Sequence, residues 1–257
     1  MKKIIDQIAS FLRAIFRIPL PRVFPPFDPT ANGYKLMFRE DFALGIDWNK
    51  WDPSEPWSGI ESTYKGIVRW MQQNVQMAFP AGIKLVATRS TEGGNDLCGL
   101  ISSHKFLEVL YGYISVRAKI PPKGFLYFPA IWMYNIQGWL PEIDIMEAMD
   151  KTSEHVSFTH HWLDSNGNHL SEGNNWKSPI DLSLDYHNYS VEWTPGKLTW
   201  YIDGIARYST TNNIPGVPLF LICNIQAGGN PAYSHLYTSD EVPMSFYIEK
   251  IEVYQKP

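Results

Sequence analysis

The stretch from residue 141 to residue 147 reads Pro141-Glu142-Ile143-Asp144-Ile145-Met146-Glu147. Acidic and apolar residues alternate in its first half, which is typical of a strand whose two faces differ. With a period of two, Glu142 and Asp144 share one face, whereas Glu147 points to the other. One extra residue, a β-bulge at Ile145 or Met146, returns Glu147 to the first face. We therefore predict a bulged strand with three carboxylates in one cleft and its apolar side chains in the core.

Three carboxylates in one cleft suit a glycosidase that retains anomeric configuration. Such an enzyme needs a carboxylate nucleophile and a carboxylic acid about 5–5.5 Å apart. A third carboxyl between them keeps one acid protonated near neutral pH. The alternative is a cluster that binds a hard cation or forms salt bridges. An ion-pair cluster would need basic neighbours, and no Lys or Arg occurs between residues 135 and 150. The stretch therefore favours catalysis.

Strand patterns continue on both sides of this stretch. Alternation is visible at residues 71–77, 83–89, 113–120 and 246–254. Residues 198–207 read as a hairpin that turns at Asp203-Gly204, a strong turn signal. Many short strands without interleaved helices predict an all-β sandwich.

Composition limits the classes of function. A length of 257 residues fits one large β domain. The 10 Trp, 14 Tyr and 13 Phe fit either sugar-stacking surfaces or a β core rich in aromatic pairs. A net charge of −4 argues against a nucleic-acid partner. No run approaches 18 apolar residues, so we expect no transmembrane segment. Cys98 and Cys223 are too few for a disulfide framework, and a single bridge between them stays open.

The N-terminal residues differ from the rest. Apolar residues recur at helical spacing within residues 1–18, but charged residues interrupt them and no small-residue cleavage site follows. We therefore favour a short docking helix over a cleavable signal. Residues 19–29 contain five prolines, which predicts an extended tether. The predicted organisation is an amphipathic segment with its Pro-rich tether at 1–29, followed by a catalytic domain at 30–257.

Several motifs, in order, resemble glycoside hydrolase family 16. Glu142 to Glu147 matches the longer, bulged form of its signature Glu-x-Asp-x-(x)-Glu. Residues 112–121, 128–133, 189–195, 200–204 and 253–255 resemble further segments of the family, with Phe128 in place of a usual Trp. The resemblance covers most of the chain. It implies a β-jelly-roll sandwich of two antiparallel sheets with a concave substrate cleft.

The resemblance also implies roles for individual residues. Glu142 matches the nucleophile, Asp144 its helper and Glu147 the acid/base. Substrate-binding candidates are Trp139 before the motif, Trp132, Arg69 and His161, the last as the histidine near the acid/base. Trp139 could instead be a loop aromatic, and Trp132 a core residue.

Similar proteins often hold a structural calcium far from the cleft. The matching positions are Asp41, Gly82 for a carbonyl, and Glu249, where the family usually has Asp. No cofactor is expected for catalysis.

The implied activity is endo-acting, retaining hydrolysis of a β-linked polysaccharide, a β-1,3-glucan or a related β-glucan or β-galactan. The bulged motif resembles laminarinases, agarases and carrageenases, although Pro141 stands where laminarinase-like enzymes usually have Gly. A transglycosylase of the same fold and a non-catalytic jelly-roll lectin are the alternatives. An extracellular or virion-associated location and a monomer are favoured.

Overall fold

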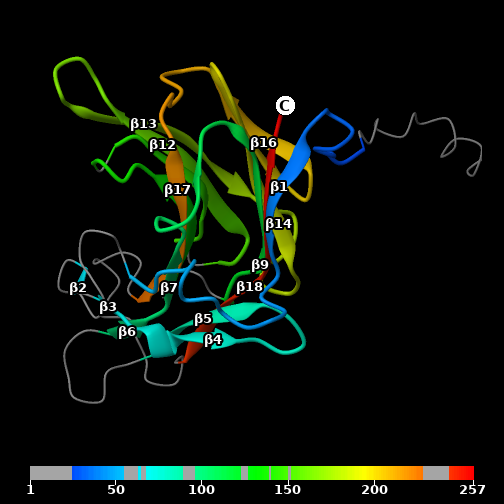
Figure 1. Cartoon of the computed structure of the whole chain (residues 1–257), viewed down its shortest axis with the longest axis vertical. Coiled ribbons are helices and arrows are strands. Elements are labelled where there is room, and N and C mark those ends of the chain that lie inside the picture. Colours follow the sequence, from blue (N-terminus) through cyan, green and yellow to red (C-terminus); the bar gives the residue numbers. More distant parts are fainter. Residues whose placement is uncertain are drawn as a thin grey trace, which may run out of the picture.

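The computed structural model describes residues 25–54, 63–64, 68–88, 96–122, 127–138, 140–149, 152–227 and 243–257. In these ranges nearly all the regular secondary structure is strand, and the helical element is a single 3-10 turn, η1 (Gln72–Asn74). The strands form two sheets that pack face to face (Figure 1). The predicted all-β sandwich is therefore confirmed.

The larger sheet consists of β1 (Lys35–Glu40), β2 (Thr63–Tyr64), β3 (Val68–Trp70), β4 (Val75–Met77), β5 (Ile83–Thr88), β6 (Asp96–Cys98), β9 (Gly112–Lys119), β14 (His187–Thr194), β15 (Lys197–Ile202), β16 (Ile205–Thr210) and β18 (Met244–Gln255). Its main path is β16-β15-β14-β9-β18-β5-β6-β3-β2, and β1 and β4 pair with β18 and β5. Its pairs are antiparallel except β3 with β6, which run parallel. The hairpin expected at Asp203-Gly204 joins β15 to β16, and both turn residues have positive φ.

The smaller sheet consists of β7 (Leu100–Ser102), β8 (Glu108–Val109), β10 (Tyr127–Tyr134), β11 (Glu142–Glu147), β12 (His155–Leu163), β13 (His169–Lys177) and β17 (Leu219–Ala227). It runs β13-β12-β11-β10-β17-β7, with β8 paired to β17, and all its pairs are antiparallel. β11 is thus central, so its backbone is held on both sides.

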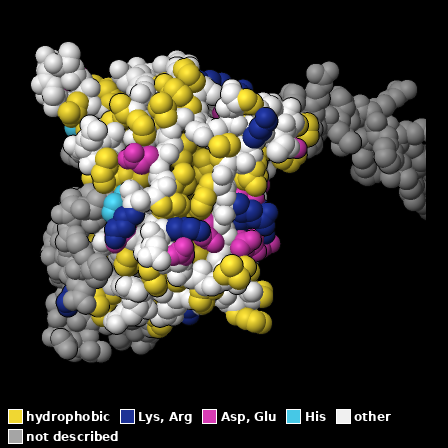
Figure 2. Space-filling model, in the orientation of Figure 1, with side chains coloured by type: hydrophobic (Ala, Val, Ile, Leu, Met, Phe, Trp, Pro, Cys, Tyr) yellow, Lys and Arg dark blue, Asp and Glu magenta, His cyan; other side chains and the backbone are white. Residues whose placement is uncertain are grey.

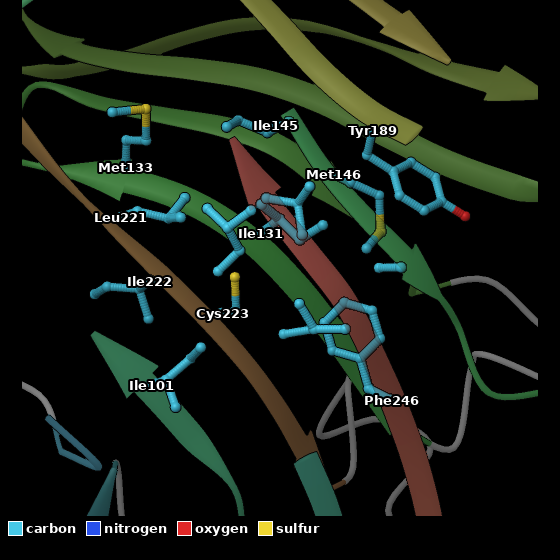
Figure 3. Close-up of a cluster of buried hydrophobic side chains, with 14 of the residues drawn as sticks. Ile101, Ile131, Met133, Ile145, Met146, Tyr189, Leu221, Ile222, Cys223 and Phe246 are labelled. Atoms are coloured by element: carbon cyan, nitrogen blue, oxygen red, sulfur yellow. The ribbon is translucent and has the colours of Figure 1, made fainter. Parts of the chain in front are cut away.

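The core fills the space between the two sheets. Figure 3 shows Ile131, Ile145 and Met146 of the smaller sheet in one buried cluster with Tyr189 and Phe246 of the larger one. All five side chains are fully buried. Burial of each large apolar side chain stabilises the fold by about 1.5–3 kcal/mol. The buried side chains of β11, the strand that carries the carboxylates, therefore help to hold the two sheets together.

Both cysteines are buried in this core and free, which settles the open question of a bridge between them. Within the described ranges, no helix has the length and apolar character needed to cross a bilayer.

A smaller cluster of aromatic side chains, separate from the core, lies on the outer face of the larger sheet. Its members Tyr34, Tyr113 and Tyr201 are nearly buried, and the Phe27 ring lies 5.0 Å from Tyr113 and 4.9 Å from Tyr201. The Phe27 amide also donates to the Gly204 carbonyl at 2.8 Å. The packed body therefore includes Phe27, before the boundary predicted after residue 29. The prediction for residues 1–24 lies outside the described residues.

Phe27 gives a test of where the packed domain begins. A chain that starts at Pro25 should unfold at the same temperature as the full chain, whereas one that starts at Pro29 should unfold at a lower temperature. Full burial of a Phe ring is worth about 1.5–3 kcal/mol, and each kcal/mol moves Tm by roughly 2–4 °C in a domain of this size. Calorimetry of both truncations and of Phe27→Ala measures this. Equal Tm values for all of them would show that Phe27 adds nothing.

Candidate active site

The predicted bulge is present in β11. Against β10, Ile131 pairs with Met146 and Trp132 pairs with Asp144, so Ile145 is the extra residue. Against β12 the register also shifts between Asp144 and Glu147. Ile145 and Met146 are both fully buried, as expected for the apolar side of the strand. The bulge therefore restores the parity that places all three carboxylates on one face.

Ladder partners define the floor around the carboxylates, because directly paired residues point to the same face of a sheet. On β10, Tyr134, Trp132 and Ala130 pair with Glu142, Asp144 and Glu147 in turn. On β12 the corresponding partners are His161, Thr159 and Ser157. These residues all lie on the outer face of the smaller sheet, where Tyr134 and Trp132 also pack against buried hydrophobic residues.

A hydrogen-bonded chain runs from the acids toward solvent. His161 Nε2 lies 2.9 Å from Asp144 Oδ2 and 3.8 Å from Glu142 Oε1. Its other ring nitrogen, Nδ1, lies 2.9 Å from Nε2 of the exposed His169. His161 was expected near the acid/base Glu147; its charge does act on Glu147, but its hydrogen bond goes to Asp144. The register of β12 opposes His161 to Glu142, so its ring reaches Asp144 instead.

Burial and mutual repulsion raise the pKa values of two acids. Burial, followed by the charge of Glu142 and a hydrogen bond with it, raises the pKa of Asp144 well above its usual range. Burial, then the charges of Asp144 and Glu142, raises the pKa of Glu147 well above its usual range, opposed by His161. A carboxyl whose pKa is raised keeps its proton to a higher pH than an ordinary acid does. Glu147 is thus suited to be a general acid.

The raised pKa of Asp144 predicts a stability change. The native state binds this proton more tightly than the unfolded chain, so native stability falls as pH rises from the ordinary Asp range toward the folded pKa. Asp144→Asn removes the ionisation and should raise Tm at pH 8, while the gain should shrink toward pH 4. Calorimetry of both proteins across this range measures the difference. A gain that is constant with pH, or a loss at pH 8, would contradict the burial of an ionisable Asp144.

Trp132 is anchored on this face by a partner far away in the sequence. Its indole N–H donates to Asn224 Oδ1 at 2.7 Å, and its ring lies 5.6 Å from that of Tyr134. Asn224 is nearly buried on β17. Sequence reasoning missed Asn224, although a lone amide in the apolar run Leu219–Ile225 was a usable signal. Trp132 therefore lies on the same face of the sheet as Asp144 and also packs against the core.

The other predicted site residues are less informative. Trp139 lies outside the described residues. Arg69 lies on β3 of the larger sheet, partly exposed, whereas the carboxylates belong to the smaller sheet. His160 is buried and stacks on Trp162, with ring centroids 4.5 Å apart. His169 was missed as well, because the sequence does not show that it pairs with Leu163 of β12, two residues along from His161.

A metal ion is the alternative use of such a cluster. One oxygen each from Glu142 and Asp144 and one nitrogen of His161 lie within 4.8 Å of one another, and this is the one such group among the described residues. Glu147 is not part of it, although it shares their face. Glu147 therefore stays separate from the Glu142 group. A retaining glycosidase requires such a separate acid opposite its nucleophile.

The three residues expected at the calcium position line one pocket, together with Arg39 and Lys250. Their oxygens already have partners, since the Arg117 guanidinium binds the Glu249 carboxylate at 2.5 Å and the Gly82 carbonyl accepts from the Ala78 amide. Figure 2 shows basic and acidic side chains side by side on this view of the surface. Calcium prefers six to eight oxygen ligands. The arrangement around Glu249 does not fit that preference.

Chelation tests both metal alternatives. Because Arg117 pairs with Glu249, and because a raised pKa disfavours the ionised forms of Asp144 and Glu147 that a cation would bind, we expect EDTA to change neither Tm nor turnover. Calorimetry and an activity assay, each with EDTA and then with added calcium, measure this. A Tm that falls with EDTA and returns with calcium would restore the site at Asp41, Gly82 and Glu249. A loss of turnover alone would point to the Glu142 group.

The chain is similar in sequence to known glycosidases. Over 275 residues the chain is 27% identical to glucan endo-1,3-beta-glucosidase A1 of Niallia circulans, covering 90% of this chain and 39% of that protein. It is 27% identical to the keratan-sulfate endo-1,4-beta-galactosidase of Sphingobacterium multivorum, covering 88% and 56%. This chain thus spans only part of each relative.

The fold has counterparts among solved structures. The laminarinase catalytic domain of Thermotoga maritima superposes with a TM-score of 0.73 at 24% identity, covering 87% of this chain and 99% of that one. The model of the family described as glycosyl hydrolases family 16 matches residues 63–243, a range that contains all three carboxylates. With most of its length matched and the bulged strand in place, the chain belongs to glycosyl hydrolases family 16.

Proposed function

We propose that this protein is a retaining endo-hydrolase of a β-linked glucan, with β-1,3-glucan as the first candidate substrate. The observation that carries the proposal is the bulge at Ile145, which puts Glu142, Asp144 and Glu147 on one face of β11. The raised pKa of Glu147 adds a proton donor to that face. Membership of the family supports a glycosidase with this set of acids.

In this proposal the reaction has two displacements. Glu147 protonates the glycosidic oxygen while Glu142 attacks the anomeric carbon, which forms a covalent glycosyl-enzyme and releases the leaving sugar. Glu147, now ionised, then takes a proton from water as that water displaces Glu142 and restores the acid. Both steps pass through a positively charged sugar, which the carboxylate of Glu142 stabilises electrostatically.

Asp144 and His161 support the nucleophile. Protonated Asp144 donates a hydrogen bond to Glu142, and His161 Nε2 holds Asp144 Oδ2 at 2.9 Å. This contact fixes the Asp144 carboxyl and keeps its proton directed at Glu142. The Trp132 ring, held by Asn224, offers a flat surface beside the acids on which a sugar ring stacks.

The choice of substrate rests on the relatives. The relative from Niallia circulans is named for endo-1,3-beta-glucan cleavage, and that from Sphingobacterium multivorum for keratan sulfate. A sulfated chain calls for Arg or Lys in the cleft, and residues 132–147 contain neither. A neutral β-glucan is therefore the better match to this floor.

Release of reducing ends tests the proposal. The full chain is incubated with laminarin, mixed-linkage β-glucan, agar, carrageenan and keratan sulfate, with Glu147→Gln as the control protein. We expect the fastest release from laminarin, oligosaccharides of mixed length, and a first product that keeps the β configuration by NMR. Binding to laminarin without release would make the protein a lectin. Transfer to an added oligosaccharide in place of hydrolysis would make it a transglycosylase.

A further inference from the structure

Trp200 donates a hydrogen bond across the sandwich to the bulge. Its indole Nε1 lies 2.8 Å from the backbone carbonyl oxygen of Asp144, and the side chain is fully buried. Trp200 belongs to β15 of the larger sheet, whereas Asp144 belongs to β11 of the smaller one. The Asp144 carbonyl therefore points into the core, while the carboxyl of the same residue lies on the opposite, cleft side.

The Trp200 ring is held in place from several directions. It lies 6.4 Å from Phe158, which stands opposite the bulge between the β12 residues paired with Asp144 and Glu147. On its other side it lies 5.3 Å from Tyr208, whose hydroxyl donates to Glu172 of β13 at 2.7 Å. A donor fixed in this way directs its N–H to one point in space.

The hydrogen bond from Trp200 to the Asp144 carbonyl determines the shape of the bulge. The peptide that follows Asp144 begins the extra residue, and its orientation sets how far Glu147 lies from Glu142 and Asp144. Ladder pairing alone does not fix this peptide, because the register of both neighbouring strands shifts here. A displacement of about 1 Å at a reacting group can cost roughly 100-fold in rate.

We propose that Trp200 is a positioning residue that sets the spacing of the acids through the Asp144 carbonyl. This inference rests on the proposed function, because it assigns the spacing to that reaction. Trp200 does not touch the substrate. It acts by holding the one peptide that lets Asp144 and Glu147 share a face.

Trp200→Phe tests the inference, with Trp193→Phe as a matched control. Trp193 is equally buried, lies on the adjacent strand β14, and donates its indole N–H to a backbone carbonyl, that of Pro215, at 3.0 Å. Both variants lose a large buried ring and one N–H donor, but only Trp200 faces the bulge. We expect Trp200→Phe to lower kcat by roughly 10–100-fold with KM little changed, and Trp193→Phe to stay within about twofold of the parent.

A second readout separates positioning from a general loss of packing. A change in the spacing of the acids alters how strongly they raise the pKa of Glu147, so the alkaline limb of kcat/KM should move in Trp200→Phe and stay in Trp193→Phe. If Trp200→Phe does not fold, a benzothienyl analogue at position 200 keeps the bicyclic shape and removes only the donor. The same loss of kcat is expected for it.

The outcomes distinguish the inference from the function on which it rests. A parent that is active and a Glu147→Gln variant that is inactive support the function. If Trp200→Phe or the analogue then matches Trp193→Phe in both kcat and pH profile, the inference is wrong. A parent that releases no reducing ends from any β-glucan overturns the proposed function and the inference with it.

Discussion

Glu142→Gln should lower kcat on β-glucan by at least about 10⁴-fold while leaving the fold intact. Loss of the nucleophile removes the covalent route, and in multi-residue sites such losses commonly reach that size. The amide has nearly the same shape as the carboxylate, so the partly exposed side chain can stay where it is. Steady-state kinetics on the polymer, with circular dichroism for the fold, measures both.

A surface variant provides the control for this loss. Glu154→Gln removes a carboxylate that only faces Lys177 at 3.8 Å, near the start of β12. It should keep kcat within about twofold, since exposed ion pairs contribute little. Residual activity above about 1% in Glu142→Gln would exclude Glu142 as the nucleophile.

Glu147→Ala should lose roughly 10²–10⁴-fold on the polymer, the usual contribution of a general acid. An aryl glycoside with a good leaving group needs no protonation, so its first displacement should survive. Azide should then restore turnover, because the small anion attacks the glycosyl-enzyme without needing the base. The product should be a glycosyl azide of retained configuration, which NMR identifies.

Azide separates the two acids as well. In Glu142→Ala, azide can only replace the nucleophile, and its product should have inverted configuration. A retained product from Glu142→Ala would mean that the roles of Glu142 and Glu147 are reversed. Absence of rescue in both variants would argue against a double displacement.

The local features of the fold could be read from the sequence. The period of two, the odd spacing between Asp144 and Glu147, and the Asp203-Gly204 turn are all short-range signals, and each has its structural counterpart. The parallel pairing of β3 with β6 was not predicted, because it joins residues about 28 positions apart through no local pattern.

The support of the site was harder to predict for the same reason. The hydrogen bond from Trp200 joins residues 56 positions apart, and the one from Trp132 to Asn224 joins residues 92 positions apart. The hydrogen bond from His161 to Asp144 was not predicted, because a sequence does not show the register of neighbouring strands. Catalytic residues that lie close together on one strand can be predicted from the sequence. Contacts between strands that are distant in the sequence cannot, because they depend on the order of strands in the sheets.

The position of Phe27 has a practical consequence for use of the protein. Phe27 is bound to the outer face of the larger sheet, whereas the acids lie on the outer face of the smaller one. The chain thus enters the domain on the side of the sandwich opposite the cleft. A bead, a carrier protein or a cell-surface anchor joined ahead of Pro25 would leave the cleft open to a long polymer, which makes this end the natural point of immobilisation.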